Sequence, residues 1–315
     1  MFLTSFMRVR ACARNLGRHR KGCRRRRGRR HDETKSRGTK LYYAGYTTTV
    51  RGRENEGKGL NYLTFHLLFT VPVLAVLGAA YLSKRLYVDD PSPLGTAIIG
   101  VIALLYTTPW DGYMIRNGVW RYGEGTVSVF FWDIPLGEYL FFVIQPLIVG
   151  LWLYLVLTRL ETRRSGGWTP RYLLTLAGLG VTVAGLWWAQ GTETFYIGMI
   201  LVWAGPVFVL QWAYGGHYLV RNFRVVAAGV VPPAVYLASA DRFAIEDGIW
   251  IISDELTTGV TVLGLPVEEG AFFFVTSLLV VQGVMLFRWT LDEWRVWVEE
   301  YETLRCITRL AGLDP

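Results

Sequence analysis

Residues 265–274 read Leu-Pro-Val-Glu-Glu-Gly-Ala-Phe-Phe-Phe and open an apolar run that continues to Phe287. A helix needs about 20 apolar residues to cross a bilayer, so this run is long enough to span one. We expect the helix to start near Pro266, because proline suits the first turn of a helix. Carboxylates at membrane depth are costly and are retained where they have a partner or a function. Glu268 and Glu269 are therefore candidate functional residues.

Aromatic side chains follow these acids at helical spacing. Phe272 and Phe273 come three and four residues after Glu269, on the same helix face. The pattern predicts an acid beside aromatic rings in an apolar pocket. It has an earlier copy at residues 135–142, which read Pro-Leu-Gly-Glu-Tyr-Leu-Phe-Phe and place Gly137 where the later copy has its first acid. The acid and the two rings of this copy are Glu138, Phe141 and Phe142.

Other patterns recur at nearly the same shift, which indicates an internal duplication. Asp111-x3-Ile115-x2-Gly118-x-Trp120 returns as Asp241-x3-Ile245-x2-Gly248-x-Trp250, and Tyr62-x9-Pro72 returns as Tyr196-x9-Pro206. Apolar runs of spanning length lie at about 62–82, 93–109, 134–157, 172–189, 195–214, 224–240 and 265–287.

The predicted fold class is an all-α polytopic membrane protein with seven transmembrane helices, arranged as two parallel three-helix repeats joined by a linker helix. With one helix between them the repeats insert in the same orientation, so Glu138 and Glu269 lie at one end of the bundle and can share a site. The expected divisions are a basic tail at 1–59, a first repeat at 60–158, a linker helix at 159–192, a second repeat at 193–288 and an interfacial amphipathic segment at 289–315.

Charge divides the chain into a tail and a body. Residues 1–60 hold 18 Lys and Arg against 4 Asp and Glu, whereas residues 61–315 hold 15 against 21. We expect the tail to be disordered. Lys and Arg cluster in the loops after the first, third and fifth predicted helices and in the C-terminal segment, which predicts a cytoplasmic C-terminus. A basic tail would then have to cross the membrane, so we expect translation to start near Val50 or Leu60.

The Pro-x-Glu-Glu and Phe-Phe motif, the preceding Asp…Gly-x-Trp stretch and the duplication over residues 61–288 resemble the membrane-integral lycopene cyclases. This family occurs as two small subunits in some bacteria, as one chain in archaea, and fused to phytoene synthase in fungi. The archaeal form is the most similar. The resemblance implies an isomerase of the intramolecular lyase type that cyclises lycopene through gamma-carotene to beta-carotene in carotenoid biosynthesis, in the cell membrane and without a cofactor.

Cyclisation of an acyclic polyene end needs a proton delivered to a terminal double bond, a carbocation kept away from water, and removal of a different proton. A buried carboxylic acid can donate the first proton, and aromatic faces stabilise a cation by about 0.5–2 kcal/mol each. We expect Glu269 to be the donor, with Glu268 or Glu138 as the base or as the neighbour that tunes it. The expected substrate contacts are Phe141, Phe142, Phe272, Phe273, Trp120, Trp250, Asp111 and Asp241.

Alternatives remain open from the sequence. The glutamates could bond neighbouring helices, Asp111 and Asp241 could cap helices, and the tryptophans could form an aromatic belt. A transporter with parallel three-helix repeats and a carotenoid hydratase are the rival functions. His66 and His217 are isolated and the three cysteines form no spaced set, so we expect no metal. The expected partners are lycopene, carotenoid intermediates, the lipid bilayer and other enzymes of the carotenoid pathway, with no nucleic acid.

Overall fold

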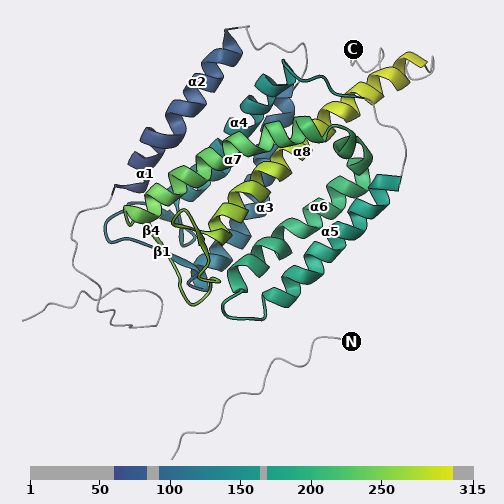
Figure 1. Ribbon diagram of the computed structural model, residues 1–315. Helices are drawn as coiled ribbons and strands as arrows, with labels where there is room; N and C mark the ends of the chain where they lie inside the picture. Colours follow the sequence, from purple (N-terminus) through teal and green to yellow (C-terminus); the bar gives the residue numbers. More distant parts are fainter. Residues whose placement is uncertain (1–59, 84–91, 164–168, 301–315) are drawn as a thin grey trace, which may run out of the picture. The chain divides into compact units, whose positions relative to one another are not determined.

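The computed structural model describes residues 60–83, 92–163 and 169–300. Helices make up most of this part of the chain (Figure 1). The first apolar run is helical from α1 (Tyr62–Phe65) through a π-helical turn, η1 (His66–Thr70), to α2 (Val71–Leu82). The other helices are α3 (Ser92–Arg116), α4 (Leu136–Leu157), α5 (Thr169–Trp188), α6 (Phe195–Arg221), α7 (Phe223–Glu246) and α8 (Val267–Glu300).

Six helical segments in the described ranges are long and apolar enough to cross a membrane. They are Tyr62–Leu82, Leu94–Arg116, Leu136–Leu157, Phe195–Arg221, Phe223–Glu246 and Val267–Arg295. The remaining expected span, residues 172–189, forms α5, but this helix is not among the six. It carries Arg171 and several threonines, which lower its mean hydropathy. The structure therefore supports a helical polytopic membrane protein.

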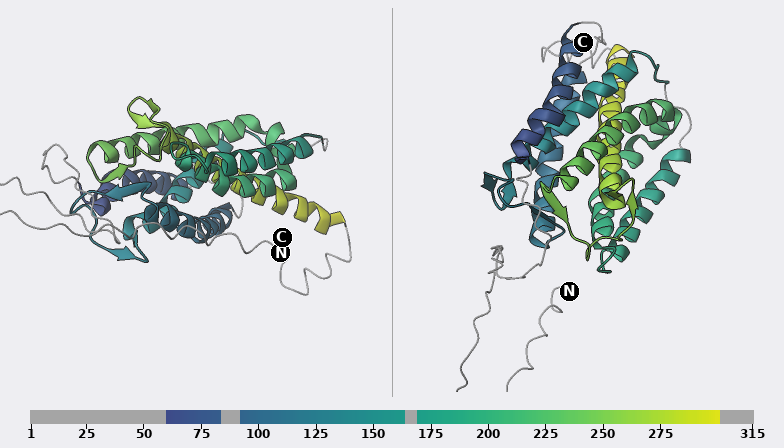
Figure 2. Two further views of the ribbon diagram at one scale, coloured as in Figure 1. Left: turned by 90° about the horizontal axis from the view of Figure 1, so that it is seen from below. Right: turned by 60° about the vertical axis from the view of Figure 1, so that its left-hand side comes forward.

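Helices α4 and α8 lie at the centre of the bundle. Helix α8 packs against α3, α4, α6 and α7, and α4 also packs against α2, α3 and α7. Helix α5 packs along α6 at the edge of the bundle (Figure 1 and Figure 2). This arrangement brings the two motif helices, which carry Glu138 and Glu269, into contact with each other.

Short strands cover one end of the helices, a feature that the all-α prediction did not include. Strand β1 (Trp120–Tyr122) pairs antiparallel with β4 (Trp250–Ile252) and aligns Trp120 with Ile252. Each motif helix is preceded by a small hairpin, β2 (Phe130–Phe131) with β3 (Ile134–Pro135) before α4, and β5 (Thr261–Val262) with β6 (Leu265–Pro266) before α8. The strands thus lie in the connections from α3 to α4 and from α7 to α8.

Two glycines end the helices that lead into the paired strands. Gly118 and Gly248 have φ values of 74° and 76°, a region that glycine enters without steric cost. The residue after each glycine donates its N–H back to the last turn, from Val119 to Met114 and from Ile249 to Ala244. This is the Schellman type of helix end. It explains why the Gly-x-Trp pattern follows both helices.

Several helix boundaries differ from the sequence prediction. Helices α3 and α7 continue past Asp111 and Asp241, so these acids lie inside helices and do not cap them. Pro266 belongs to β6, and α8 begins one residue later. Helix α8 runs without a break through Glu300, so residues 289–300 extend it. The basic tail, its proposed start and residues 301–315 lie outside the described residues.

Candidate functional site

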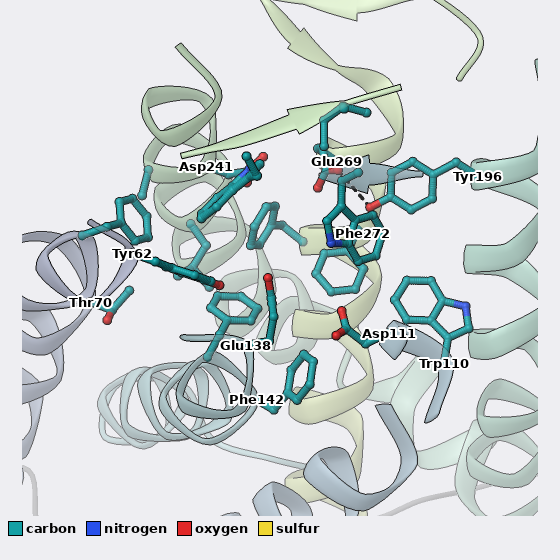
Figure 3. A pocket seen from close by; sticks show the side chains of 18 residues that line it. Tyr62, Thr70, Trp110, Asp111, Glu138, Phe142, Tyr196, Asp241, Glu269 and Phe272 are labelled. Atoms are coloured by element: carbon teal, nitrogen blue, oxygen red, sulfur yellow. Dashed lines mark hydrogen bonds between the residues drawn. The ribbon is translucent and has the colours of Figure 1, made fainter. Parts of the chain in front are cut away.

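A cavity lies between the motif helices and the paired strands, and we call it the carboxyl pocket (Figure 3). It holds about 630 Å³ of empty space, counted to its open mouth. Its lining residues are Tyr62, Phe65, Thr70, Trp110, Asp111, Trp120, Glu138, Phe141, Phe142, Tyr196, Leu237, Ala240, Asp241, Trp250, Ile252, Glu269, Phe272 and Phe273. Ten of the eleven site residues expected from the sequence are in this set; Glu268 is the exception.

Four carboxyl groups and no basic side chain line the pocket. Asp111, Asp241 and Glu269 are buried, and Glu138 is partly buried. Figure 3 shows the four acids around one space, with Asp241 and Glu269 on one side and Glu138 and Asp111 on the other. Unscreened like charges in an apolar cavity repel strongly. The arrangement therefore favours carboxyls that keep protons over four carboxylates.

Glu269 sits in the first turn of α8 and is held by a tyrosine from α6. The hydroxyl of Tyr196 donates to Oε1 of Glu269 at 2.9 Å. Tyr196 is itself fixed at the start of its helix, where its N–H donates to the carbonyl of Leu256 at 3.1 Å. The carboxyl group therefore has a defined orientation toward the pocket.

Glu138 is held by a longer chain of hydrogen bonds. The indole N–H of Trp120 donates to the hydroxyl of Tyr122 at 3.1 Å, and that hydroxyl donates to Oε1 of Glu138 at 2.9 Å. Burial, together with the nearby carboxyls of Glu138 and Asp111, raises the pKa of Tyr122 well above its usual range. The tyrosine hydroxyl thus keeps its proton and remains a donor to Glu138.

The two aspartates differ in their bonding. Trp250 donates its indole N–H to Oδ1 of Asp241 at 3.0 Å. Oδ2 of Asp241 and Oδ2 of Asp111 are buried without a hydrogen-bond partner among the described residues. Buried polar atoms are usually paired, and exceptions often mark a place where a ligand or water binds.

Glu268 points away from the pocket, unlike its neighbour Glu269. Its Oε1 accepts from both the N–H and the hydroxyl of Thr258, each at 2.7 Å. Adjacent residues on a helix do not face each other, which separates the two carboxyls. In the first copy of the motif the equivalent position is Gly137, where an added Cβ would lie 2.3 Å from the ring of Tyr62. Glycine is therefore the residue that fits there.

Aromatic rings form much of the remaining wall. Phe272 stacks on Trp110 with ring centroids 5.9 Å apart and an angle of 6° between the planes. Phe141 meets Phe273 edge to face at 5.9 Å, and Tyr62 meets Trp250 in the same way at 5.0 Å. Trp110, Trp120 and Trp250 are buried in the protein, so these three do not form an interfacial belt. These rings can face a cation from several directions.

Sequence reasoning assigned no role in the site to Tyr62, Tyr122 or Tyr196, or to Thr70. Tyr62 and Tyr196 stand at matching places in the duplicated pattern, and this repetition is the signal that could have identified them. Tyr122 has no such signal, because its counterpart in the second copy is Ile252. Its role depends on the pairing of β1 with β4, a long-range contact.

Among the described residues, no group of three or more His, Cys, Asp or Glu side chains is arranged to hold a metal ion. His66 lies between α1 and α4, with Nδ1 3.0 Å from Oγ1 of Thr70 and Nε2 2.9 Å from the carbonyl oxygen of Gly137. Both ring nitrogens therefore have structural partners.

The chain is similar to curated proteins from archaea and fungi. It is 47% identical over 239 residues to "Lycopene beta-cyclase" of Halobacterium salinarum strain R1 and of strain NRC-1, which covers 75% of this chain and 99% of each relative. It is also 34% identical over 245 residues to "Bifunctional lycopene cyclase/phytoene synthase" of Leptosphaeria maculans. This alignment covers 73% of the chain and 41% of the fungal protein. No family model and no solved structure matches the chain. The identity to the archaeal proteins over nearly their whole length shows that this chain belongs to the lycopene beta-cyclase family.

Proposed function

We propose that this protein is a lycopene beta-cyclase, an isomerase of the intramolecular lyase type that converts lycopene through gamma-carotene to beta-carotene. The observation that carries the proposal is the carboxyl pocket. Two tyrosine-bound glutamates face an aromatic cavity with no basic residue in its lining. The names of the archaeal relatives agree with this chemistry.

The reaction moves protons and leaves the number of electrons unchanged. A carboxylic acid donates its proton to the terminal double bond of the polyene, which leaves a tertiary carbocation. The next double bond attacks this cation and closes a six-membered ring, and the cation moves to a ring carbon. A carboxylate then removes a proton from the adjacent ring carbon, which forms the ring double bond. The aromatic walls stabilise the cation and exclude water.

In our proposal Glu269 donates the proton and Glu138 accepts the other one. Both side chains line the pocket and both are oriented by a tyrosine hydroxyl. Asp111 and Asp241 line the pocket and each has one buried oxygen without a partner among the described residues, so the lone pairs of these oxygens are available to the cation. Phe141, Phe142, Phe272, Phe273, Trp120 and Trp250 contact the substrate. Glu268, which bonds Thr258, has a positioning role for the turn before α8.

The proposed architecture is two parallel three-helix repeats, 60–158 and 193–288, joined by the segment 159–192 with α5 as the seventh helix. Reciprocal hydrogen bonds support this layout. Tyr106 donates to the carbonyl of Trp203 at 2.8 Å, and Tyr236, at the matching place in the second repeat, donates to the carbonyl of Phe69 at 2.6 Å. Each repeat thus contacts the other through the same type of bond.

We further propose that the protein lies in the cell membrane with a cytoplasmic C-terminus, takes lycopene from the bilayer and needs no cofactor. The described spans support membrane insertion. We also propose another enzyme of the carotenoid pathway as a partner. Its product would be an insoluble polyene that serves as the substrate of this protein.

The rival functions receive less support. A transporter needs a polar path, but the cavity between the halves is lined mainly by aromatic and apolar groups around its acids. A hydratase would begin with the same protonation and end with water attack on the cation. The wall of stacked rings favours exclusion of water, and the product distinguishes the two enzymes.

The test is expression of the full chain in bacteria that accumulate lycopene, followed by chromatography of the extracted pigments. The expected product is beta-carotene, formed without an added cofactor. Unchanged lycopene, with the protein detected in the membrane, would contradict the proposal. Hydroxylated products would favour the hydratase.

A further inference from the structure

A second cavity adjoins the carboxyl pocket, and we call it the apolar chamber. It lies between α3, α4, α6 and α8 and holds about 910 Å³ of empty space, counted to its open mouth. No charged residue lines it. Three phenylalanines, Phe141, Phe142 and Phe272, line both cavities. The chamber therefore begins at the aromatic wall where the carboxyl pocket ends.

The chamber opens toward the outside of the bundle between α3 and α6. Two of its lining residues are strongly exposed, Ile102 on α3 at 55% and Leu210 on α6 at 70%. Both helices are among those able to cross a membrane. In a bilayer these apolar side chains face lipid, so the opening leads into the hydrocarbon region.

Three polar side chains of the chamber, Gln145, Trp203 and Gln211, have a buried atom without a hydrogen-bond partner among the described residues, and in Gln145 and Trp203 this atom is an N–H donor. Gln145 lines the chamber and is 4% exposed, and its Nε2 has no hydrogen-bond partner among the described residues. An amide N–H buried without an acceptor costs free energy. The π face of a conjugated chain accepts a weak hydrogen bond from N–H, whereas a saturated lipid tail offers no such acceptor.

We infer that the apolar chamber binds the conjugated middle of the carotenoid while one of its ends reacts in the carboxyl pocket, and that the substrate enters from the bilayer between α3 and α6. This inference rests on the proposed function. A long polyene with its end between the glutamates must continue beyond the aromatic wall. The chamber offers an uncharged and mainly apolar path that starts at that wall.

The experiment fills the chamber and compares two substrates. In Ala103→Trp the new ring occupies the chamber, whereas in Ala97→Trp the same substitution lies on the same helix at an exposed residue outside both cavities. Purified variants receive lycopene or a shorter acyclic polyene with the same terminal group. Ala103→Trp should slow lycopene cyclisation by at least about tenfold, because the new ring takes the place of part of the bound polyene; a tenfold change corresponds to about 1.4 kcal/mol of binding free energy. It should cyclise the short substrate at the wild-type rate, and Ala97→Trp should match wild type on both.

A second pair of variants keeps the test decisive if Ala103→Trp fails to fold. Leu210 and Leu105 are both 70% exposed, but only Leu210 lines the chamber. Leu210→Trp should slow lycopene cyclisation and spare the short substrate, and Leu105→Trp should do neither. If wild type converts lycopene and the chamber variants do so equally well, or if they lose both substrates together, the chamber does not hold the polyene. A wild type that converts neither substrate would instead overturn the proposed function.

Discussion

The two glutamates of the carboxyl pocket occupy matching places on α4 and α8 but have different surroundings. Glu269 receives one hydrogen bond from Tyr196. Glu138 interacts with Tyr62, the counterpart of Tyr196, and receives a further hydrogen bond from Tyr122, which is itself bonded by Trp120. In the second copy Ile252 replaces Tyr122, and the tryptophan there bonds Asp241 instead. The chain has duplicated the position of the acid and has changed the hydrogen bonds around it.

This difference has a chemical meaning. An acid and a base that serve one reaction need different proton affinities, and different hydrogen bonds are a means to achieve this. Both glutamates line one cavity, so in our proposal a single pocket contains both roles. The two ends of lycopene would then react there one after the other, with the monocyclic product turning round between the steps.

The largest expected effect comes from Glu269→Gln. Glutamine keeps the shape and accepts the bond from Tyr196, but it has no acidic proton to transfer. Because positioned acid–base catalysis contributes about 10²–10⁴-fold, lycopene should accumulate. Pigment analysis at equal membrane expression measures this, with the exposed Glu255→Gln as the matched control. Similar beta-carotene from Glu269→Gln and wild type would assign the acid elsewhere, with Asp241 and Asp111 as the next candidates.

Glu138→Gln tests whether the two glutamates share one reaction or serve one end each. With Glu138 as the base for both rings, the variant should lose most activity and leave lycopene, with little gamma-carotene. Accumulation of gamma-carotene as the main product would instead assign one glutamate to each end. A time course of lycopene, gamma-carotene and beta-carotene separates these results.

Removal of either tyrosine hydroxyl should have a smaller effect than replacement of a glutamate. Tyr196→Phe and Tyr122→Phe each remove one hydrogen bond to a glutamate and keep the ring. A hydrogen bond of this kind contributes about 1 kcal/mol, so each variant should be about fivefold slower. The pH dependence of the rate should also change, and in different ways for the two variants. Identical pH profiles for the pair would show that the two surroundings do not distinguish the glutamates.

The smallest effect is expected from Glu268→Gln. Its side-chain oxygen can still accept both bonds from Thr258, and it lies outside the pocket lining. Cyclisation should stay within about twofold of wild type, since Glu268 is buried outside the pocket lining and glutamine keeps the hydrogen bonds that its side-chain oxygen accepts. A loss as large as that of Glu269→Gln, with equal expression, would bring Glu268 into the chemistry.

The sequence predicted much of this site because its signals are local and duplicated. Helical spacing placed Phe272 and Phe273 beside Glu269, and the repeat brought Glu138 to the same end; these residues line one pocket. The separation of Glu268 from Glu269 also follows from helical geometry, although their adjacency in the sequence suggested a pair of acids acting together. Tyr122 could not be predicted, since its place depends on strands of three residues that pair over 130 positions.

Helix boundaries were less predictable for a related reason. Apolar runs mark the part of a helix that lipid or protein covers, whereas α3 and α7 continue through buried polar residues to their glycine ends. Asp111 and Asp241 therefore appeared to lie at helix termini, where caps are common. Burial of a carboxyl within a helix is a tertiary feature, and it became visible only with the packed bundle.

In our proposal cyclisation begins with a proton from a pocket carboxyl, and a reaction in deuterium oxide shows where that proton comes from. A carboxyl exchanges its proton with solvent, so in deuterium oxide the ring carbon that is first protonated should receive deuterium. Mass spectrometry of the product should show one deuterium for each ring formed, and Glu269→Gln should give almost no labelled product. Beta-carotene formed in deuterium oxide without added mass would contradict proton-initiated cyclisation at this site.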